Sequence, residues 1–162
     1  MKPLYMIGCV NEIGKRQKAD NVSGLLGESG FREYMNQLDT PLETGYLLRI
    51  GIDHFKEIND NFGQEYGDFV LKKTAECISG CTSEGQKVYK LVADEFLILD
   101  ASSDEAQDAD KLYDKVRETI DRFIETNEFK VIYTVSGGIV PFAALKGNQY
   151  AEALKLTDFS PE

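Results

Sequence analysis

Apolar residues recur along the chain with two periods, and these periods predict an alternation of strands and helices. A continuous apolar run between Gly45 and Asp53 is typical of a buried central strand. Short apolar runs on both sides of Val92-Ala93-Asp94-Glu95 predict a β-hairpin with an acidic tip. The predicted elements are, in order, a strand over 46–52, a short helix containing Phe55 and Ile58, a helix from about 67 to 79, hairpin strands over 87–91 and 96–99, a long amphipathic helix over 109–124, a strand over 131–135 ending at Ser136-Gly137-Gly138, and a helix over 150–156.

This order of elements indicates one α/β domain with a mixed central sheet and flanking helices. It is the pattern of ferredoxin-like and polymerase-palm folds. The sequence contains no internal repeat, low-complexity tract or proline-rich linker that would divide it.

The charge balance restricts the partners of this domain. Among 162 residues, 28 Asp and Glu outnumber 18 Lys and Arg, so the formal net charge is −10. Duplex nucleic acids are bound mainly through Lys and Arg on phosphates, and we therefore expect no nucleic-acid partner. A small anionic ligand would need a metal ion or backbone N–H groups to offset the negative field.

Cysteine content and hydropathy bear on location. Three cysteines are too few, and odd in number, for a disulfide framework, which favours a reducing, cytoplasmic setting. No apolar run approaches the roughly 18 residues that suggest a membrane-spanning helix. We therefore expect no membrane contact by this chain.

Several short motifs occur together. The segment 51–63 reads GIDHFKEINDNFG, Tyr66-Gly67-Asp68 follows it, and Asp94-Glu95-Phe96 lies in the hairpin. These motifs resemble the GGDEF family of diguanylate cyclases, and 20–26 and 135–139 are similar to that family's opening motif and late strand. The resemblance covers about Asp20 to the C-terminus. It implies a cyclase fold related to polymerase palms, in a family that condenses two GTP into cyclic di-GMP across two domains with divalent metal.

The resemblance also implies roles for individual residues. Asn59 and Asp68 occupy the positions that hydrogen-bond guanine, with the amide donating and accepting and the carboxylate accepting. Asp94 and Glu95 would be catalytic in an active enzyme and would hold Mg²⁺ when a nucleotide is bound. Asp53, at the end of the central strand, is a third candidate Mg²⁺ ligand from its position and not from the resemblance. Palm-type phosphoryl transfer requires such carboxylates on neighbouring strands, because the cations offset triphosphate charge.

Two departures from the family pattern predict impaired catalysis. The first metal-binding acid of the family is replaced by Gly51, and the glycine pair of the signature is replaced by Val92 and Ala93. A non-glycine residue at positive φ costs roughly 1–2 kcal/mol, so the hairpin must change shape or remain strained. Val92 would also intrude on the space of the phosphates.

Further expectations concern regulation and boundaries. The family's inhibitory Arg-x-x-Asp motif would fall at Ser83 and Gln86, so we expect no inhibitory site. Residues 1–18 are similar to the end of an upstream sensor module and its linker. Residues 19–162 then form the GGDEF-like domain, truncated before its last helix and strand, whose basic residues would contact the triphosphate.

Each candidate residue also has a structural interpretation. We favour Asp53 as the N-cap of the helix that follows over Asp53 as a metal ligand replacing the acid missing at Gly51. Asp94 and Glu95 are either a residual cation site, which we favour, or a solvated turn. Asn59 and Asp68 form a guanine site or local helix-capping contacts. We expect a surface or structural role for His54, no chemistry at Cys77 and Cys81, and core packing for Phe55, Phe62 and Phe69.

Three functions remain open. The favoured one is a catalytically impaired, regulatory domain of a cyclic di-GMP signalling protein that binds GTP. The second is an active diguanylate cyclase, and the third is a dimerisation or scaffold domain without nucleotide binding. The expected partners are GTP or cyclic di-GMP, other signalling domains in the same chain, and a second copy in a homodimer.

Overall fold

The computed structural model describes residues 19–102, 106–127 and 131–158. Residues 1–18, where the sequence predicts the end of an upstream module, lie outside the described residues. The helices are α2 (Glu28–Asn36), α3 (Phe55–Phe62), α4 (Gln64–Cys81), α5 (Ala106–Thr126) and α6 (Tyr150–Leu156), with a 3-10 turn η1 (Gly147–Gln149) before α6. The strands are β1 (Leu42–Ile52), β2 (Gln86–Lys90), β3 (Glu95–Asp100) and β4 (Val135–Leu145). None of the helices in these ranges is both long enough and apolar enough to cross a membrane.

The strands form one sheet in the order β2-β3-β1-β4, and the predicted α/β sandwich is confirmed. Every pairing in the described sheet is antiparallel, whereas the sequence analysis expected a mixed sheet. The helical crossovers do connect parallel strands, but another strand lies between the members of each pair. β3 separates β1 from β2, and β1 separates β3 from β4.

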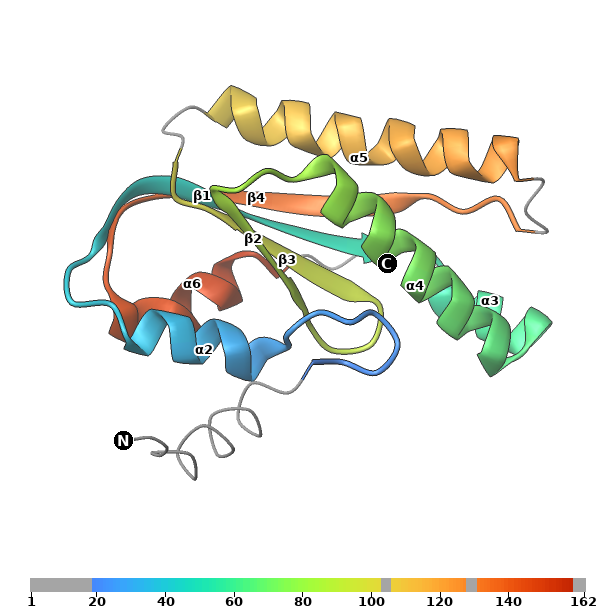
Figure 1. The fold of residues 1–162 in the computed structure, drawn as a ribbon, viewed down its shortest axis with the longest axis horizontal. Helices are drawn as coiled ribbons and strands as arrows, with labels where there is room; N and C mark the ends of the chain where they lie inside the picture. Colours follow the sequence, from blue (N-terminus) through green and yellow to red (C-terminus); the bar gives the residue numbers. More distant parts are fainter. Residues whose placement is uncertain (1–18, 103–105, 128–130, 159–162) are drawn as a thin grey trace, which may run out of the picture.

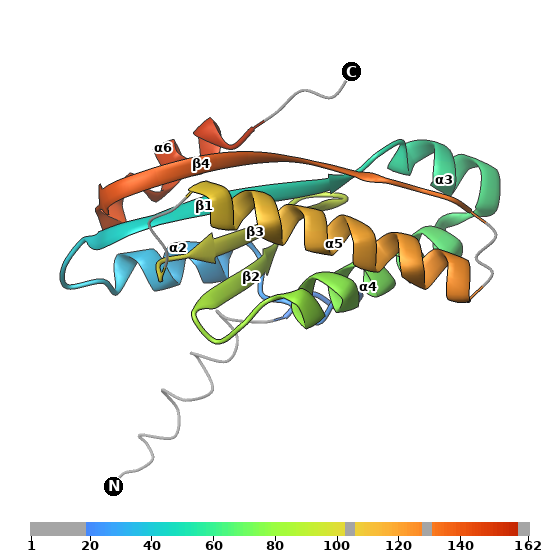
Figure 2. The same ribbon diagram turned by 90° about the horizontal axis from the view of Figure 1, so that it is seen from above.

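The helices cover the sheet on both faces. Figure 1 shows α4 and α5 on one face and α2 and α6 on the other, while Figure 2 shows α3 beyond the end of β1. Alternation along β1 divides the core accordingly. Leu48 and Ile50 join the cluster under α4 and α5, and Leu47 joins the cluster under α2 and α6.

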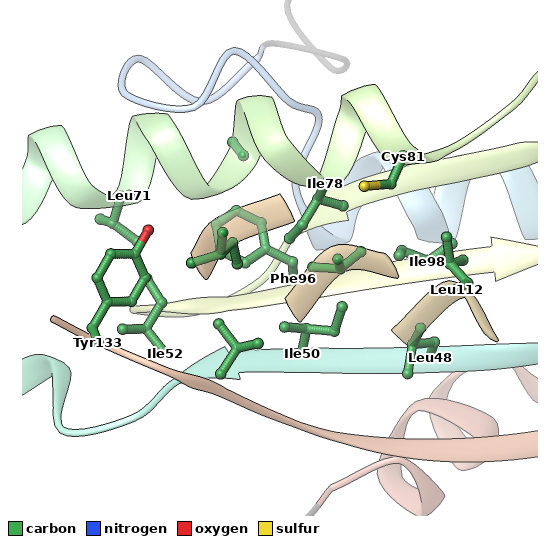
Figure 3. Packing of buried hydrophobic residues seen from close by; sticks show 14 of the residues in the cluster. Leu48, Ile50, Ile52, Leu71, Ile78, Cys81, Phe96, Ile98, Leu112 and Tyr133 are labelled. Carbon is green, nitrogen blue, oxygen red and sulfur yellow. The ribbon is translucent and has the colours of Figure 1, made fainter. Parts of the chain in front are cut away.

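The larger core cluster lies between the sheet and the helices α4 and α5. Figure 3 shows Ile50 and Ile52 of β1 and Phe96 of β3 directed toward α4, where Leu71 and Ile78 meet them. Such an apolar layer is the main source of folding free energy, since burial stabilises by roughly 25 cal/mol per Å². It fixes the end of β1, where the candidate functional residues begin.

One predicted strand is wrongly placed. Residues 131–134 lie outside the strand, and β4 begins where the prediction ended, at Val135. Gly137 pairs with Ile50 inside the sheet, and a Cβ on it would lie 2.9 Å from the carbonyl oxygen of Arg49 and 3.1 Å from the ring of Tyr113. The glycine therefore permits close packing within the strand instead of marking its end.

The other predicted elements are confirmed with shifted limits. The helix predicted from about 67 begins at Gln64, directly after Gly63, whose φ of +93° separates it from α3. The first helix, α2, was not predicted from the apolar pattern. It packs Phe31 and Met35 against the second face of the sheet.

Candidate functional site

Asp53 follows β1 and connects it to the beginning of β4. Its carboxylate oxygens accept hydrogen bonds from the hydroxyls of Thr134 and Ser136, each at 2.6 Å. Its backbone N–H donates to the carbonyl oxygen of Thr134 at 2.9 Å. The N-cap of α3 is His54, at a φ of 58°, and no side chain among the described residues caps this helix. The predicted N-cap role of Asp53 is therefore wrong, because two hydroxyls on β4 and its approach hold the carboxylate instead.

Asp94 approaches β1 from the opposite side, at the end of the hairpin turn. Its Oδ2 accepts the backbone N–H of Ile52 at 3.0 Å. Burial raises the pKa of Asp94 above its ordinary value, and the charge of Glu95 adds to this, while the N–H of Ile52 acts in the opposite direction. Asp94 is thus a half-buried carboxylate attached to the end of β1.

Glu95 begins β3 opposite Gly51 and forms an ion pair with Arg49. Its Oε1 accepts Nε–H of Arg49 at 3.0 Å and Nη2–H at 2.5 Å. The side chains of Arg49 and Glu95 are only 15% and 25% exposed. Glu95 therefore already has a positive partner supplied by the protein, and it is not part of a solvated turn.

The hairpin turn retains a backbone conformation that favours glycine. Ala93 has a φ of 61°, whereas Val92 is not among the described residues with positive φ and is 74% exposed. Of the two predicted outcomes, the strained one is therefore observed at Ala93. Lys90 holds the turn closed, since its ammonium donates to the carbonyl oxygens of Leu91 at 2.7 Å and Ala93 at 2.5 Å.

The amide of Asn59 lies between α3 and α4. Its Oδ1 is fully buried, and no group in the described ranges donates a hydrogen bond to it. A Cβ on Gly67 would lie 1.7 Å from this atom, so only glycine at this position leaves room for the amide. Asp68, half-buried, follows Gly67 on α4. The structure therefore brings the predicted guanine-binding pair to one helix corner.

The three predicted metal ligands do not converge. In the part of the chain that the structure describes, no group of three or more His, Cys, Asp or Glu could hold a metal ion together. The oxygens of Asp53 accept two hydroxyls, Glu95 is paired with Arg49, and Gly51 has no carboxylate. Among the described residues, no set of three acidic side chains therefore holds a cation by itself, while Mg²⁺ bound by one or two carboxylates and the phosphates of a nucleotide stays a prediction.

The remaining sequence candidates lie away from this centre. The exposed side chain of His54 lies 3.4 Å from the carboxylate of Glu57, which confirms its surface position. Cys77 and Cys81 are free thiols on α4, and burial raises the pKa of Cys77 to about 11. No chemistry was predicted for these two cysteines, and none is assigned to them.

Two aromatic residues expected in the core are half-exposed. Phe62 is 45% and Phe69 is 41% exposed, so the core prediction is wrong for both. Tyr66 lies between them, with ring centroids 5.5 Å and 6.0 Å away. Their helical spacing matched that of core residues, but they lie along the outer side of the α3–α4 corner. Phe55 packs against the core as expected.

The sequence analysis missed two cations. Arg49 lies within the apolar strand, and Lys90 ends β2 before the hairpin turn. A single charge inside a buried strand is itself a signal, because such a charge requires a partner. The position of that partner, on β3, became visible only in the structure.

Comparison with known proteins gives a consistent result. A family model described as Diguanylate cyclase, GGDEF domain, matches residues 18–159. Diguanylate cyclase A of Treponema denticola is 31% identical over 98 residues, which are 60% of this chain and 26% of that protein. The chain thus spans about a quarter of the length of this curated relative.

Solved structures share the fold. The GGDEF domain of PA1120 from Pseudomonas aeruginosa has a TM-score of 0.69 and 26% identity, covering 84% of this chain and 87% of that one. The GGDEF domain of DgcB from Caulobacter crescentus, solved in complex with c-di-GMP, has a TM-score of 0.68 and 22% identity, covering 83% of each chain.

Proposed function

The chain belongs to the GGDEF domain family, and we propose that it is a catalytically impaired member that binds GTP as a regulatory module of a cyclic di-GMP signalling protein. The observation that carries this proposal is the unsatisfied amide oxygen of Asn59. A buried polar atom without a partner costs about 1–3 kcal/mol. The oxygen has no exposed surface and lies against Gly67, so a ligand donor would recover this cost by drawing the amide of Asn59 out of the α3–α4 corner.

Guanine suits the donors and acceptors of this corner. Its N1–H and 2-amino group are donors, and the carboxylate of Asp68 and the amide oxygen of Asn59 are acceptors. The amide nitrogen of Asn59 can donate to an acceptor on the base. Adenine lacks the paired donors, so the proposed site selects GTP over ATP.

Impaired turnover follows from the state of the acidic residues. Position 51 has no carboxylate, and Glu95 is engaged by Arg49. The carboxylate of Asp53 is occupied by hydroxyl donors from the approach to β4 and from β4 itself. With these groups committed to protein contacts, Mg²⁺ would enter only on the triphosphate of a bound nucleotide.

The partners proposed for this module follow from the family. They are GTP or cyclic di-GMP, other signalling domains of the same protein, and a second copy in a homodimer, in the cytoplasm. Diguanylate cyclase A has regions beyond the matched segment, since that segment spans 26% of it. The activity of the whole protein therefore remains part of the proposal.

Isothermal titration with GTP, and with ATP as the control nucleotide, tests the binding step. We expect saturable, GTP-selective binding by the wild-type chain and at least tenfold weaker binding by Asn59→Ala, since one hydrogen bond to a buried group is worth about 1.4 kcal/mol or more. Asn61→Ala is the matched control, because Asn61 is an exposed amide on the same helix. Absence of GTP binding at saturating nucleotide would refute the proposal and favour a scaffold.

A turnover assay separates impaired from active domains. Chromatography of GTP incubated with the protein and Mg²⁺ should show no cyclic di-GMP above a no-protein control. Product that forms in the wild type and disappears in Asp94→Ala would establish an active diguanylate cyclase instead.

A further inference from the structure

Arg49 occupies a central position among the acidic residues. It lies on β1 two positions before Gly51, so both residues are on the same face of the sheet. Arg49 pairs in register with Leu97 and reaches diagonally to Glu95, the residue opposite Gly51. The guanidinium thus lies beside the position from which the family's first acid is missing.

The same guanidinium connects a third element. Its Nη1 donates to the carbonyl oxygen of Leu154 at 3.2 Å and to the hydroxyl of Thr157 at 3.3 Å. These groups are at the C-terminal end of α6, where the carbonyl oxygen of Leu154 also accepts the N–H and the hydroxyl of Thr157. Arg49 therefore joins β1, β3 and α6 through one positive charge whose side chain is 15% exposed.

Lys90 supplies a second positive charge near the acidic residues. Its ammonium is anchored on the carbonyl oxygens of Leu91 and Ala93, and it interacts electrostatically with Asp20, Asp94 and Glu95. The acids of the hairpin are thus offset by cations that belong to the chain. The carboxylates of the hairpin therefore do not depend on a bound metal ion for neutralisation.

We propose that Arg49 is the resident counter-ion of Glu95, that it takes the electrostatic role of a divalent metal, and that it fixes α6 to the sheet. Both the absence of an acid at position 51 and the presence of Arg49 make the site less negative. With fewer negative charges and a fixed cation, the site no longer requires a protein-held metal. A further consequence, which rests on the proposed function, is that GTP binding persists when divalent ions are chelated.

Binding of Mn²⁺ and thermal unfolding test this role without nucleotide. Free Mn²⁺ is counted by electron paramagnetic resonance with the chain in excess, and unfolding is followed with and without Mn²⁺. The wild type should leave the Mn²⁺ signal and the unfolding temperature unchanged. Arg49→Met should lower the unfolding temperature, and Mn²⁺ should partly restore it, because Glu95 then loses its ion-pair partner and only Lys90 remains near Glu95 and Asp94.

Two further variants keep the test decisive if Arg49→Met does not fold. Arg49→Lys retains the charge and should remain insensitive to Mn²⁺. Glu95→Gln should also be destabilised, since it leaves the guanidinium buried without its anion, and Mn²⁺ should not restore it.

Either of two results would overturn the proposal. One is uptake of Mn²⁺ by the wild type that Glu95→Gln abolishes, and the other is Arg49→Met with wild-type stability in the absence of metal. Because these measurements contain no nucleotide, they are independent of the proposed function. Failure to bind GTP would refute that function and leave the role of Arg49 standing.

Discussion

Two glycines of α4 should respond in opposite directions to the same substitution. A Cβ on Gly80 would meet nothing within 4 Å, whereas a Cβ on Gly67 would lie 1.7 Å from Oδ1 and 2.8 Å from Cγ of Asn59. Both glycines lie in the helix Gln64–Cys81. Gly67→Ala and Gly80→Ala therefore form a matched pair, because the substitution is the same in both and only the surroundings of the added methyl group differ.

The expected magnitudes follow from two opposing effects. Replacing glycine by alanine in a helix stabilises by about 0.4–1 kcal/mol. Gly80 precedes the last residue of α4, so the gain there should be at the lower end of this range. At Gly67 the amide of Asn59 must move by more than an ångström, and such overpacking costs typically about 1–3 kcal/mol. Gly67→Ala should thus be less stable than Gly80→Ala by about 1–3 kcal/mol, because the helix propensity gain largely cancels in the comparison.

Urea denaturation followed by far-UV circular dichroism measures this difference. In thermal unfolding followed by the same signal, Gly80→Ala should raise the unfolding temperature by about 1–2 °C, since 1 kcal/mol corresponds to about 2–4 °C in a domain of this size. Gly67→Ala should also weaken GTP binding, because Asn59 is displaced. The double variant Asn59→Ala/Gly67→Ala should recover stability relative to Gly67→Ala. Equal stability of Gly67→Ala and Gly80→Ala would refute the close contact between Gly67 and Asn59.

The remaining predictions concern the hairpin, the core and acid stability. Ala93→Gly should raise the free energy of unfolding by up to about 1 kcal/mol, measured by thermal unfolding. The strain energy released at positive φ exceeds the free-energy cost of the more flexible unfolded chain. A less stable Ala93→Gly variant would contradict this. Thr74→Val removes the hydroxyl that lies 2.7 Å from the hydroxyl of Tyr133, and urea denaturation should show a loss of about 1–2 kcal/mol in the free energy of unfolding. The double variant Thr74→Val/Tyr133→Phe should lose less, because no buried hydroxyl then remains without its partner. Burial alone would raise the pKa of Asp100, but hydrogen bonds from groups that include Ser102 bring this pKa below its ordinary value of 3.8. The ionised carboxylate therefore stabilises the fold above about pH 3.8, and this stabilisation is lost as the pH falls through the pKa of the folded state. Asp100→Asn should therefore be less stable at neutral pH, with the difference narrowing in unfolding curves measured below about pH 4; a difference that is independent of pH would contradict this.

Local sequence determined the alternation of elements and their buried faces. The apolar run of β1 and the helical spacing of α5 predicted both elements, because each buries a single face or stripe that its period reveals. The motif from Gly51 to Asp68 also placed Asn59 and Asp68 as candidates for one site. The elements depend on neighbours within a few residues, so they can be inferred without knowledge of the fold, whereas the pair Asn59 and Asp68 was assigned through the resemblance to the GGDEF family.

Residues whose surroundings depend on contacts distant in sequence were harder to predict. Phe62 and Phe69 have the same spacing as core residues, yet they are half-exposed, because nothing in the described structure covers that side of the α3–α4 corner completely. The glycines before Ile139 were interpreted as a strand end, but Tyr113 on α5 packs closely against Gly137. Exposure and close approach are properties of tertiary packing, which a local pattern does not encode.

The sequence by itself determined which ionisable groups the chain carries and which family acid it lacks at Gly51. Only the tertiary structure decided how those groups are paired. Arg49 and Glu95 are 46 positions apart and meet because β1 and β3 are neighbours in a fixed register. Asp53, a candidate metal ligand by sequence, instead accepts hydroxyls from residues 81 and 83 positions away. The physical reason is that the strength of an ionic or hydrogen-bonded contact depends on distance and burial, and folding sets both.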